Sequence, residues 1–318
     1  MADLDFVTLD VFTTTPYKGN PLAIVHLPPP DSGVSLSHEQ KLAITGEFNL
    51  SETVFLHSAE AATASGLDAT TTRRIDIYMP GRELPFAGHP TIGSAKYLEP
   101  LGITQLITKA GPIPIRFASG IASASIPHDT HLNSQTLQDA EARIDTSRLH
   151  STSEIRAAEL AAPIFAIVKG MTFALIRLPS LEALAQVGPG AFPIAPKDIM
   201  DDGWSDTFIG RYYNVLTETS VSDAGVRTVK LRTRMVETTL EDPATGSAAC
   251  ALTSYLALHE YEEKKIRFEL TQGVEMGRQS DIVVDITVGV EGGVRRIEEV
   301  LLGGTARQIM KGKLAVPP

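Results

Sequence analysis

The chain has 318 residues, 43% of them hydrophobic and 21% charged, which is the composition of a globular protein of about two domains. Its formal net charge is −10 and its Lys and Arg residues form no run longer than a pair, which argues against nucleic acid or an anionic membrane as a partner. The single cysteine, Cys250, excludes an intrachain disulfide and any metal site built from several cysteines.

In chain order, the first residues are acidic and lack the apolar core of a signal peptide, and no apolar run approaches the roughly 18 residues that span a bilayer. We therefore expect a cytoplasmic protein that does not cross a membrane. Ser37 and Gln40 form a capping box ahead of a helix that ends near Phe48. The Ala-, Thr- and Ser-rich segment 58–72 is predicted to be a surface loop. Strands are predicted at 6–12, 22–27, 51–57 and 75–79, and a further helix from Pro90 to about Leu98.

The second half of the chain repeats the plan of the first. Residues 89–95 and 242–248 both read X-Pro-x-x-Gly-Ser-Ala, with His89 and Asp242 as X, and their separation of 242 − 89 = 153 is close to half of 318. Other pairs of segments share offsets of 151–154, and they indicate two copies of one domain rather than a solenoid. They are 19–28 with 170–179, Glu52-Thr53 with Asp206-Thr207, and 75–77 with 229–231.

The predicted elements favour an α+β fold. Each half places many strands around one long, nearly apolar helix, which predicts two pseudo-symmetric domains, each a mostly antiparallel curled sheet around a central helix. We expect an N-terminal domain over 1–125, a C-terminal domain over 126–304, and a last segment, 305–318, that returns to the first domain.

Both echoed motifs are predicted to begin a helix. Proline favours the first helical position and keeps the preceding residue out of the helix, so His89 and Asp242 should each lie just before a helix start. Glycine and serine near that start leave backbone N–H groups uncrowded, and such groups bind anions. Two such ends would hold a small acidic substrate. The alternative is that both are ordinary helix starts with no ligand.

Glu52 is the candidate general base. It lies at the mouth of an apolar strand, where partial desolvation would raise its pKa toward neutrality and let it hold or release a proton. The alternatives are a solvent-facing Glu52 and a structural, hydrogen-bonded His89. Cys250, inside an apolar helix, is expected to be buried and inert. No nucleotide-binding, metal-binding or serine-nucleophile motif occurs in the sequence, so no cofactor and no metal are expected.

These segments resemble the PhzF family of phenazine-biosynthesis isomerase-like proteins. The resemblance rests on Ser51-Glu52-Thr53-Val54-Phe55, on 85–93, on 241–248, on the Gly19-Asn20-Pro21 region and on Gln272-Gly273-x-x-Met276-Gly277-Arg278. It implies the diaminopimelate-epimerase-type fold, with the active site in the cleft between the domains. Epimerases of this fold use one cysteine per domain, whereas here the matched helix starts carry His89 and Asp242, so two-cysteine racemisation is unavailable.

The resemblance also implies a cofactor-independent acid/base isomerase. Glu52 would move the C–H proton, and His89 and Asp242 would hold the polar groups of a small carboxylate substrate. Asn20, Gly88, Gly246 and Ser247 are the expected substrate-binding residues. The alternatives are an epimerase, hydrolase or decarboxylase in the same cleft, or a catalytically idle member that binds a metabolite or a partner. A homodimer is expected from the resemblance and from the general frequency of such assemblies.

Overall fold

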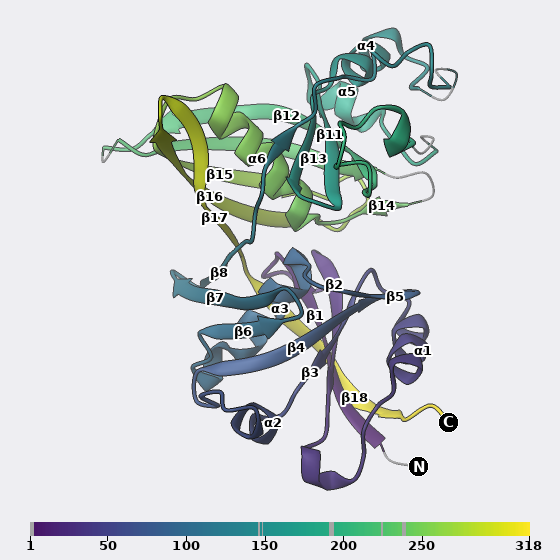
Figure 1. Ribbon diagram of the computed structural model, residues 1–318, viewed down its shortest axis with the longest axis vertical. Helices are drawn as coiled ribbons and strands as arrows, with labels where there is room; N and C mark the ends of the chain where they lie inside the picture. The colour runs from purple at the N-terminus through teal and green to yellow at the C-terminus, as the bar shows by residue number, and fades with distance from the viewer. Residues whose placement is uncertain (1–2, 146, 148, 191–193, 224, 237–239) are drawn as a thin grey trace. The chain divides into compact units, whose positions relative to one another are not determined.

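The computed structural model describes residues 3–145, 147, 149–190, 194–223, 225–236 and 240–318 (Figure 1). The chain divides into two compact units: unit 1 comprises Met1–Ser125 and Gly303–Pro318, and unit 2 comprises Ile126–Leu302. Within the described ranges, no helix is long and apolar enough to cross a membrane.

Unit 1 is a curled sheet with three helices. Its strands are β1 (Asp3–Val11), β2 (Asn20–His26), β3 (Thr53–Leu56), β4 (Thr72–Met79), β5 (Arg82–Leu84), β6 (Gln105–Thr108), β7 (Gly111–Ala118), β8 (Ile121–Ser125) and β18 (Ala306–Ala315). Its helices are α1 (His38–Phe48), α2 (Ala59–Ala64) and α3 (Gly88–Leu98). The last strand of the chain, β18, pairs antiparallel with β1, so the yellow end of the chain runs beside its purple start in Figure 1.

Unit 2 has the same plan. Its strands are β9 (His131–Leu132), β10 (Ile164–Val168), β11 (Met171–Arg177), β12 (Ile209–Val221), β13 (Arg227–Val236), β14 (Glu241–Asp242), β15 (Lys265–Gln272), β16 (Ser280–Glu291) and β17 (Val294–Gly304). The last two residues of β17, Gly303 and Gly304, already belong to unit 1. The helices are α4 (Ser153–Ala161), α5 (Leu181–Ala185) and α6 (Gly246–His259).

Strand pairing shows that the two units are copies of one fold. In unit 1 the order β18-β1-β2-β3-β4-β6-β7 has the directions antiparallel, antiparallel, parallel, antiparallel, parallel, antiparallel. In unit 2 the order β9-β10-β11-β12-β13-β15-β16 has the same six directions. The predicted fold class, α+β with two similar curled sheets, is therefore confirmed.

The register corrects the equivalences that we predicted from the sequence. Ala23 pairs with Thr53 in unit 1, and Ala174 pairs with Arg211 in unit 2. The difference in residue number between equivalent positions of the two units is therefore 174 − 23 = 151 in the first strand of this pair and 211 − 53 = 158 in the second. The first residues of α3 and α6 differ by the larger of these numbers, since 246 − 88 = 158. The connection after β11 is thus 158 − 151 = 7 residues longer than its counterpart after β2.

Several predicted matches change as a result. His89 corresponds to Ser247, the second residue of α6, and Asp242 corresponds to Leu84 in the short strand β5. Glu52 corresponds to Gly210 rather than to Asp206, and segment 75–77 corresponds to 233–235 rather than to 229–231. The shared X-Pro-x-x-Gly-Ser-Ala pattern is therefore out of register with the fold.

The proline rule also failed at both helices. Helix α3 begins at Gly88, ahead of Pro90, so His89 lies inside its first turn. Helix α6 begins at Gly246, after Pro243, and Asp242 belongs to strand β14. Pairing of β14 with β13 takes precedence over helix initiation at Pro243, because Met235 is the cross-strand partner of Asp242.

The central helices form the core of each unit. Every residue of α3 from Gly88 to Ala95 is buried, and α6 buries residues around its whole circumference. A helix that is apolar on all sides has to be enclosed, and the curled sheets provide that enclosure. This confirms the predicted central helices.

Two local predictions had different outcomes. The capping box is present: Ser37 Oγ accepts from Gln40 N at 3.2 Å, and Gln40 Oε1 accepts from Ser37 N at 2.9 Å. Segment 58–72 is not all loop, because α2 occupies Ala59–Ala64 with Ser58 as its N-cap. A capped alanine-rich run has high helix propensity, which the loop prediction overlooked.

Candidate active site

Glu52 and His89 meet in unit 1. Glu52 immediately precedes β3 and His89 lies in the first turn of α3, and their side chains are joined by a 2.9 Å contact between Glu52 Oε2 and His89 Nδ1. The His89 side chain is 4% exposed and that of Glu52 is 20% exposed. Because a carboxylate only accepts hydrogen bonds, Nδ1 carries the hydrogen.

The other ring nitrogen of His89 has no partner in the described part of the chain. His89 Nε2 is buried and makes no hydrogen bond there. A buried polar atom without a partner is costly, and such atoms are uncommon in folded proteins. An orphan nitrogen on a ring that is already fixed by Glu52 indicates a place for a polar group of a ligand. These contacts favour a functional His89 over a structural one.

The pKa of Glu52 is lowered, contrary to our expectation. Burial raises it, but the hydrogen bond and charge of His89, together with the Ser51 hydroxyl, outweigh burial and hold the pKa below its ordinary value of 4.5. Glu52 is therefore a carboxylate at neutral pH. In that form its oxygens can accept a proton.

Asn20 lies at the same edge of the sheet. It begins β2, which runs parallel to β3, and its Oδ1 lies 3.5 Å from the hydroxyl of Ser51, the neighbour of Glu52. Gly19 allows this turn: its φ is 69°, and a Cβ there would lie 2.3 Å from the carbonyl oxygen of Val11. The structure thus brings together Asn20, Glu52, Gly88 and His89.

The starts of α3 and α6 lack side-chain caps. Neither N-cap residue, Ala87 for α3 or Thr245 for α6, makes a side-chain capping bond; α4 also lacks one, whereas α1, α2 and α5 have one. The first-turn N–H groups of a helix need partners from outside the helix. Gly88, Gly246 and Ser247 are thus placed where backbone donors can bind an anion.

Asp242 is held by residues that the sequence analysis did not identify. Its Oδ2 accepts from Thr245 Oγ1 at 2.6 Å. Gln272, which is fully buried, donates from Nε2 to the Asp242 carbonyl at 2.8 Å and to Thr245 Oγ1 at 3.0 Å. Gln272 Oε1 lies 3.0 Å from the Tyr212 hydroxyl and accepts from Thr245 N at 3.3 Å. Gln272 therefore fixes the turn that carries Asp242 into α6.

The acid next to Asp242 has a structural role. Glu241 makes a two-bond pair with Arg234, with Nε–Oε1 at 2.8 Å and Nη2–Oε2 at 2.7 Å. Both side chains are buried, and Arg234 also donates to the Leu184 carbonyl at 3.0 Å. This pair anchors β14. Glu241 is thus bound by Arg234, whereas Asp242 is bound by Thr245.

Gly273 explains why glycine follows Gln272. Its φ is 72°, and a Cβ would lie 2.7 Å from the Pro243 carbonyl oxygen and 2.6 Å from that of Arg278. The backbone next to Asp242 thus packs directly on this glycine. The Gln-Gly pair was quoted above only for its family resemblance. Its contacts give it a physical role, which no local pattern in the sequence could have revealed.

Cys250 is fully buried inside α6, and burial raises its pKa far above the ordinary range. The prediction of an inert thiol is confirmed. In the described residues, no three His, Cys, Asp or Glu side chains converge as a metal site would require.

Comparison with known proteins shows the family of the chain. The sequence model of the phenazine biosynthesis-like protein family matches residues 9–312, nearly the whole chain. The chain belongs to the phenazine biosynthesis-like, or PhzF, family. An uncharacterized isomerase of Mesorhizobium japonicum is 30% identical over 99% of this chain and 100% of its own length. A trans-2,3-dihydro-3-hydroxyanthranilate isomerase of Pseudomonas fluorescens is 30% identical, with 87% and 88% covered.

Solved structures agree on the fold. A PhzF-family protein of Bacillus anthracis superposes with a TM-score of 0.72 at 19% identity, covering 99% of this chain and 100% of that one. A hydroxyproline epimerase of Agrobacterium vitis gives 0.56 at 11% identity, with 99% and 93% covered. The resemblance to the PhzF family and to the epimerase-type fold is confirmed, and the chain is an isomerase of this family.

Proposed function

We propose that this PhzF-family protein is a cofactor-independent isomerase that moves a proton between two positions of a small carboxylic acid. The observation that carries the proposal is the Glu52–His89 pair, in which an ionised carboxylate is fixed by a ring whose second nitrogen is buried without a partner in the described chain. The pair lies at the uncapped start of α3.

The proton transfer needs no redox partner. The Glu52 carboxylate takes a proton from a carbon next to an unsaturated system, and the electron pair of that C–H bond moves into the unsaturated system. Protonated Glu52 then returns the hydrogen to another carbon of the same molecule, so the product is an isomer. The Nδ1–H of His89 orients the carboxylate throughout, and Nε2 binds a polar group of the substrate.

The remaining predicted residues are assigned to substrate binding. Asp242 and the first-turn N–H groups at Gly246 and Ser247 bind polar and carboxylate groups of the substrate, because these donors lack a side-chain cap and Asp242 is held rigidly by Thr245. Gly88 and Asn20 serve the same purpose beside Glu52. General acid–base catalysis supplies about 10²–10⁴-fold. Orientation and fixed dipoles supply the remainder.

The test is isotope exchange in heavy water. Relatives are named trans-2,3-dihydro-3-hydroxyanthranilate isomerases, so this acid heads a panel of small cyclic carboxylic acids and amino acids. Mass spectrometry follows deuterium entering a C–H position. Glu52→Gln keeps the shape but cannot accept the proton, and we expect it to lose about 10²-fold or more of the exchange rate. Glu47→Gln, on the exposed surface of α1, is the matched control and should exchange at the wild-type rate.

Other outcomes identify the alternatives. Calorimetric binding of a panel member without exchange by the wild-type protein would support a catalytically idle metabolite-binding protein. Exchange at the substrate α-carbon with inversion would indicate an epimerase. Exchange that survives in Glu52→Gln would mean that Glu52 is not the base.

A further inference from the structure

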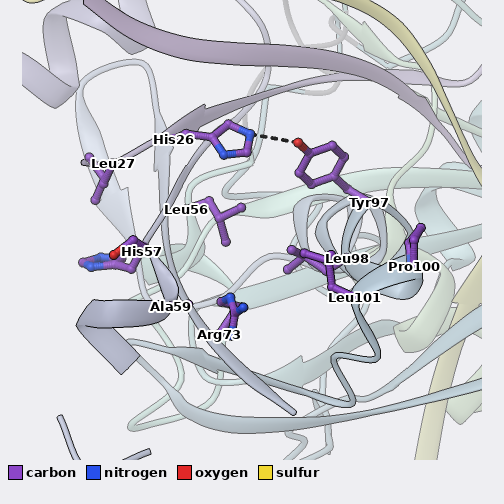
Figure 2. Close-up of a pocket in the computed structure, with 11 residues that line it drawn as sticks. His26, Leu27, Leu56, His57, Ala59, Arg73, Tyr97, Leu98, Pro100 and Leu101 are labelled. Carbon is purple, nitrogen blue, oxygen red and sulfur yellow. Dashed lines mark hydrogen bonds between the residues drawn. The ribbon is translucent and has the colours of Figure 1, made fainter. Parts of the chain in front are cut away.

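Unit 1 contains a hollow that Glu52 does not line. A cavity of about 330 Å³ opens beside the ends of β2, β3 and α3, which is within the size range of small-molecule sites (Figure 2). Its wall combines leucines with the side chains of His26, Arg73 and Tyr97.

The cavity lies at the opposite end of the elements that carry the catalytic pair. His89 is in the first turn of α3 while Leu98 ends the helix, and nine residues of helix span about 13 Å. In the same way, Glu52 precedes β3 whereas Leu56 ends it. The hollow is therefore distinct from the Glu52–His89 pair.

The charge of the lining is opposite to that of the chain. The protein carries 38 acidic against 28 basic residues, yet the described lining contains Arg73 and no Asp or Glu. Of the two histidines in the lining, His57 contacts Asp76 at 2.9 Å, and burial lowers the pKa of His26. Arg73 uses Nη1 to donate to the carbonyls of Ala69 and Thr72. Its Nε and Nη2 make no hydrogen bond or ion pair in the described chain, although its charge is near enough to Glu60 to help lower the pKa of that carboxyl group. That edge of a guanidinium is the one that binds a carboxylate with two parallel hydrogen bonds.

His26 and Tyr97 add one hydrogen-bond donor. His26 Nε2 lies 3.0 Å from the Tyr97 hydroxyl, the contact drawn dashed in Figure 2. Burial lowers the pKa of His26, against a smaller opposing effect of Asp5, and burial raises the pKa of Tyr97, so both are neutral near pH 7. The neutral pair holds one N–H and one O–H, and one of these is used in the mutual bond. The other is left for a ligand, whichever tautomer is present.

The remaining wall is apolar. Leu56 and Leu98 are buried beneath the hollow, whereas Leu101 stands at its rim with 61% of its surface exposed. Figure 2 shows Leu56 and Leu98 between the His26–Tyr97 pair and Arg73. A compact apolar body can therefore lie on the leucines while a carboxylate reaches Arg73.

We infer that this cavity is a second ligand site, for a monocarboxylic acid with a compact apolar body. Arg73 binds the carboxylate through Nε and Nη2, the leucines contact the body, and the His26–Tyr97 pair donates one hydrogen bond. The inference does not depend on the proposed isomerase activity, because none of these residues belongs to the Glu52–His89 pair.

The probe is 4-fluorobenzoate, observed by fluorine NMR line broadening and by calorimetry with the full-length protein. Arg73→Gln should weaken binding roughly tenfold to hundredfold, since it removes a charged hydrogen-bonding partner. Arg74→Gln is the matched control, because neighbouring residues of a strand point to opposite faces, and its affinity should equal that of the wild type. Uncharged 4-fluorobenzyl alcohol should bind at least tenfold more weakly than the acid.

Two further variants locate the probe. Leu101→Asp places a negative charge, like that of the probe, at the exposed rim of the cavity and should reduce affinity at least tenfold. Met310→Asp changes a similarly exposed residue of β18 and should not reduce it. Glu52→Gln should leave the affinity unchanged. The inference is overturned if 4-fluorobenzoate does not bind at millimolar concentration, if Arg73→Gln and Leu101→Asp both bind as the wild type does, or if Glu52→Gln abolishes binding.

Discussion

Opposing effects act on the pKa of one carboxylate of unit 1, that of Glu52. Burial alone would raise the pKa of Glu52 toward neutrality, which is what its apolar strand predicts. His89 reverses the direction of this pKa shift, because its charge and its Nδ1–H, which lies 2.9 Å from Glu52 Oε2, stabilise the carboxylate. The partner is 37 residues away in the sequence, so neighbouring residues could not reveal it. Glu52 could be proposed as a candidate from the sequence, but the direction of its pKa shift required the fold.

Removing His89 should therefore change the pH dependence of exchange. The base form of Glu52 is deprotonated, so the rate falls as the pH drops through its pKa. In the wild type this pKa is below 4.5, and exchange should be level from pH 5 upward. In His89→Leu, burial is opposed only by Ser51, so the pKa should rise above 4.5 and the acid limb should move toward neutral pH. The measurement is kcat/KM for exchange between pH 4 and pH 8.

His89→Asn is the matched variant for this experiment. Its side-chain amide can donate to Glu52 from near the position of Nδ1, so its acid limb should lie between those of wild type and His89→Leu. Both variants should be slower, because each loses the proposed contact between Nε2 and substrate, and the position of the limb is therefore the informative quantity. An acid limb that stays in place in His89→Leu would show that His89 does not control the pKa of Glu52.

At the level of elements, the turn from β14 into α6 is held by a strand that follows the helix. Gln272 ends β15, and its side chain uses both amide atoms to fix the backbone and threonine that orient Asp242. A two-residue strand would have little stability alone, and the Arg234–Glu241 pair and Gln272 together hold it. The geometry of Asp242 is thus set by residues on β13 and β15.

Gln272→Met should separate positioning from simple stability. It keeps the approximate volume but leaves Thr245 N without its partner and removes one of the two contacts of the Tyr212 hydroxyl, which keeps Thr233, so the free energy of unfolding should fall by about 1–3 kcal/mol. If Asp242 binds substrate, its loosened turn should also raise KM with a smaller change in kcat.

Urea unfolding and exchange kinetics measure the two effects. Gln279→Met, on the exposed surface, is the control and should match the wild type in both. A Gln272→Met protein that is destabilised but keeps the wild-type KM would limit Gln272 to a structural role.

On the scale of the whole molecule, the sequence repeat predicted the duplication but not its register. The apolar central helices and the alternation of strands were sufficient for the fold class. The equivalences were wrong after β2, because an insertion of 158 − 151 = 7 residues in a connection leaves no periodic signal and the motifs around His89 and Asp242 resemble each other by coincidence of composition. Only the hydrogen-bond register between strands shows that Ser247 is the counterpart of His89.

The two units also differ in how their sheets are completed. In unit 2 the strand beside β10 is β9, which belongs to the same continuous segment, whereas in unit 1 the strand beside β1 is β18 from the far end of the chain. Without β18, β1 would be an edge strand along Asp3–Val11, although Leu4, Leu9 and Val11 are buried. Phe12, buried at a φ of 63°, would also lose its bond from N–H to the Thr305 carbonyl at 2.7 Å.

We therefore expect the units to behave differently as fragments. Fragment 126–302 contains all seven strands of the order β9-β10-β11-β12-β13-β15-β16 and should unfold cooperatively in urea. Fragment 1–125 should lack cooperative unfolding and protected amides in β1, and addition of peptide 303–318 should restore both, because the peptide supplies β18 and its register with β1. Circular dichroism and hydrogen exchange measure these properties, and a scrambled peptide of the same composition is the control. Cooperative unfolding of 1–125 alone, unaffected by the peptide, would show that β18 is dispensable and that the discontinuity of unit 1 has no energetic role.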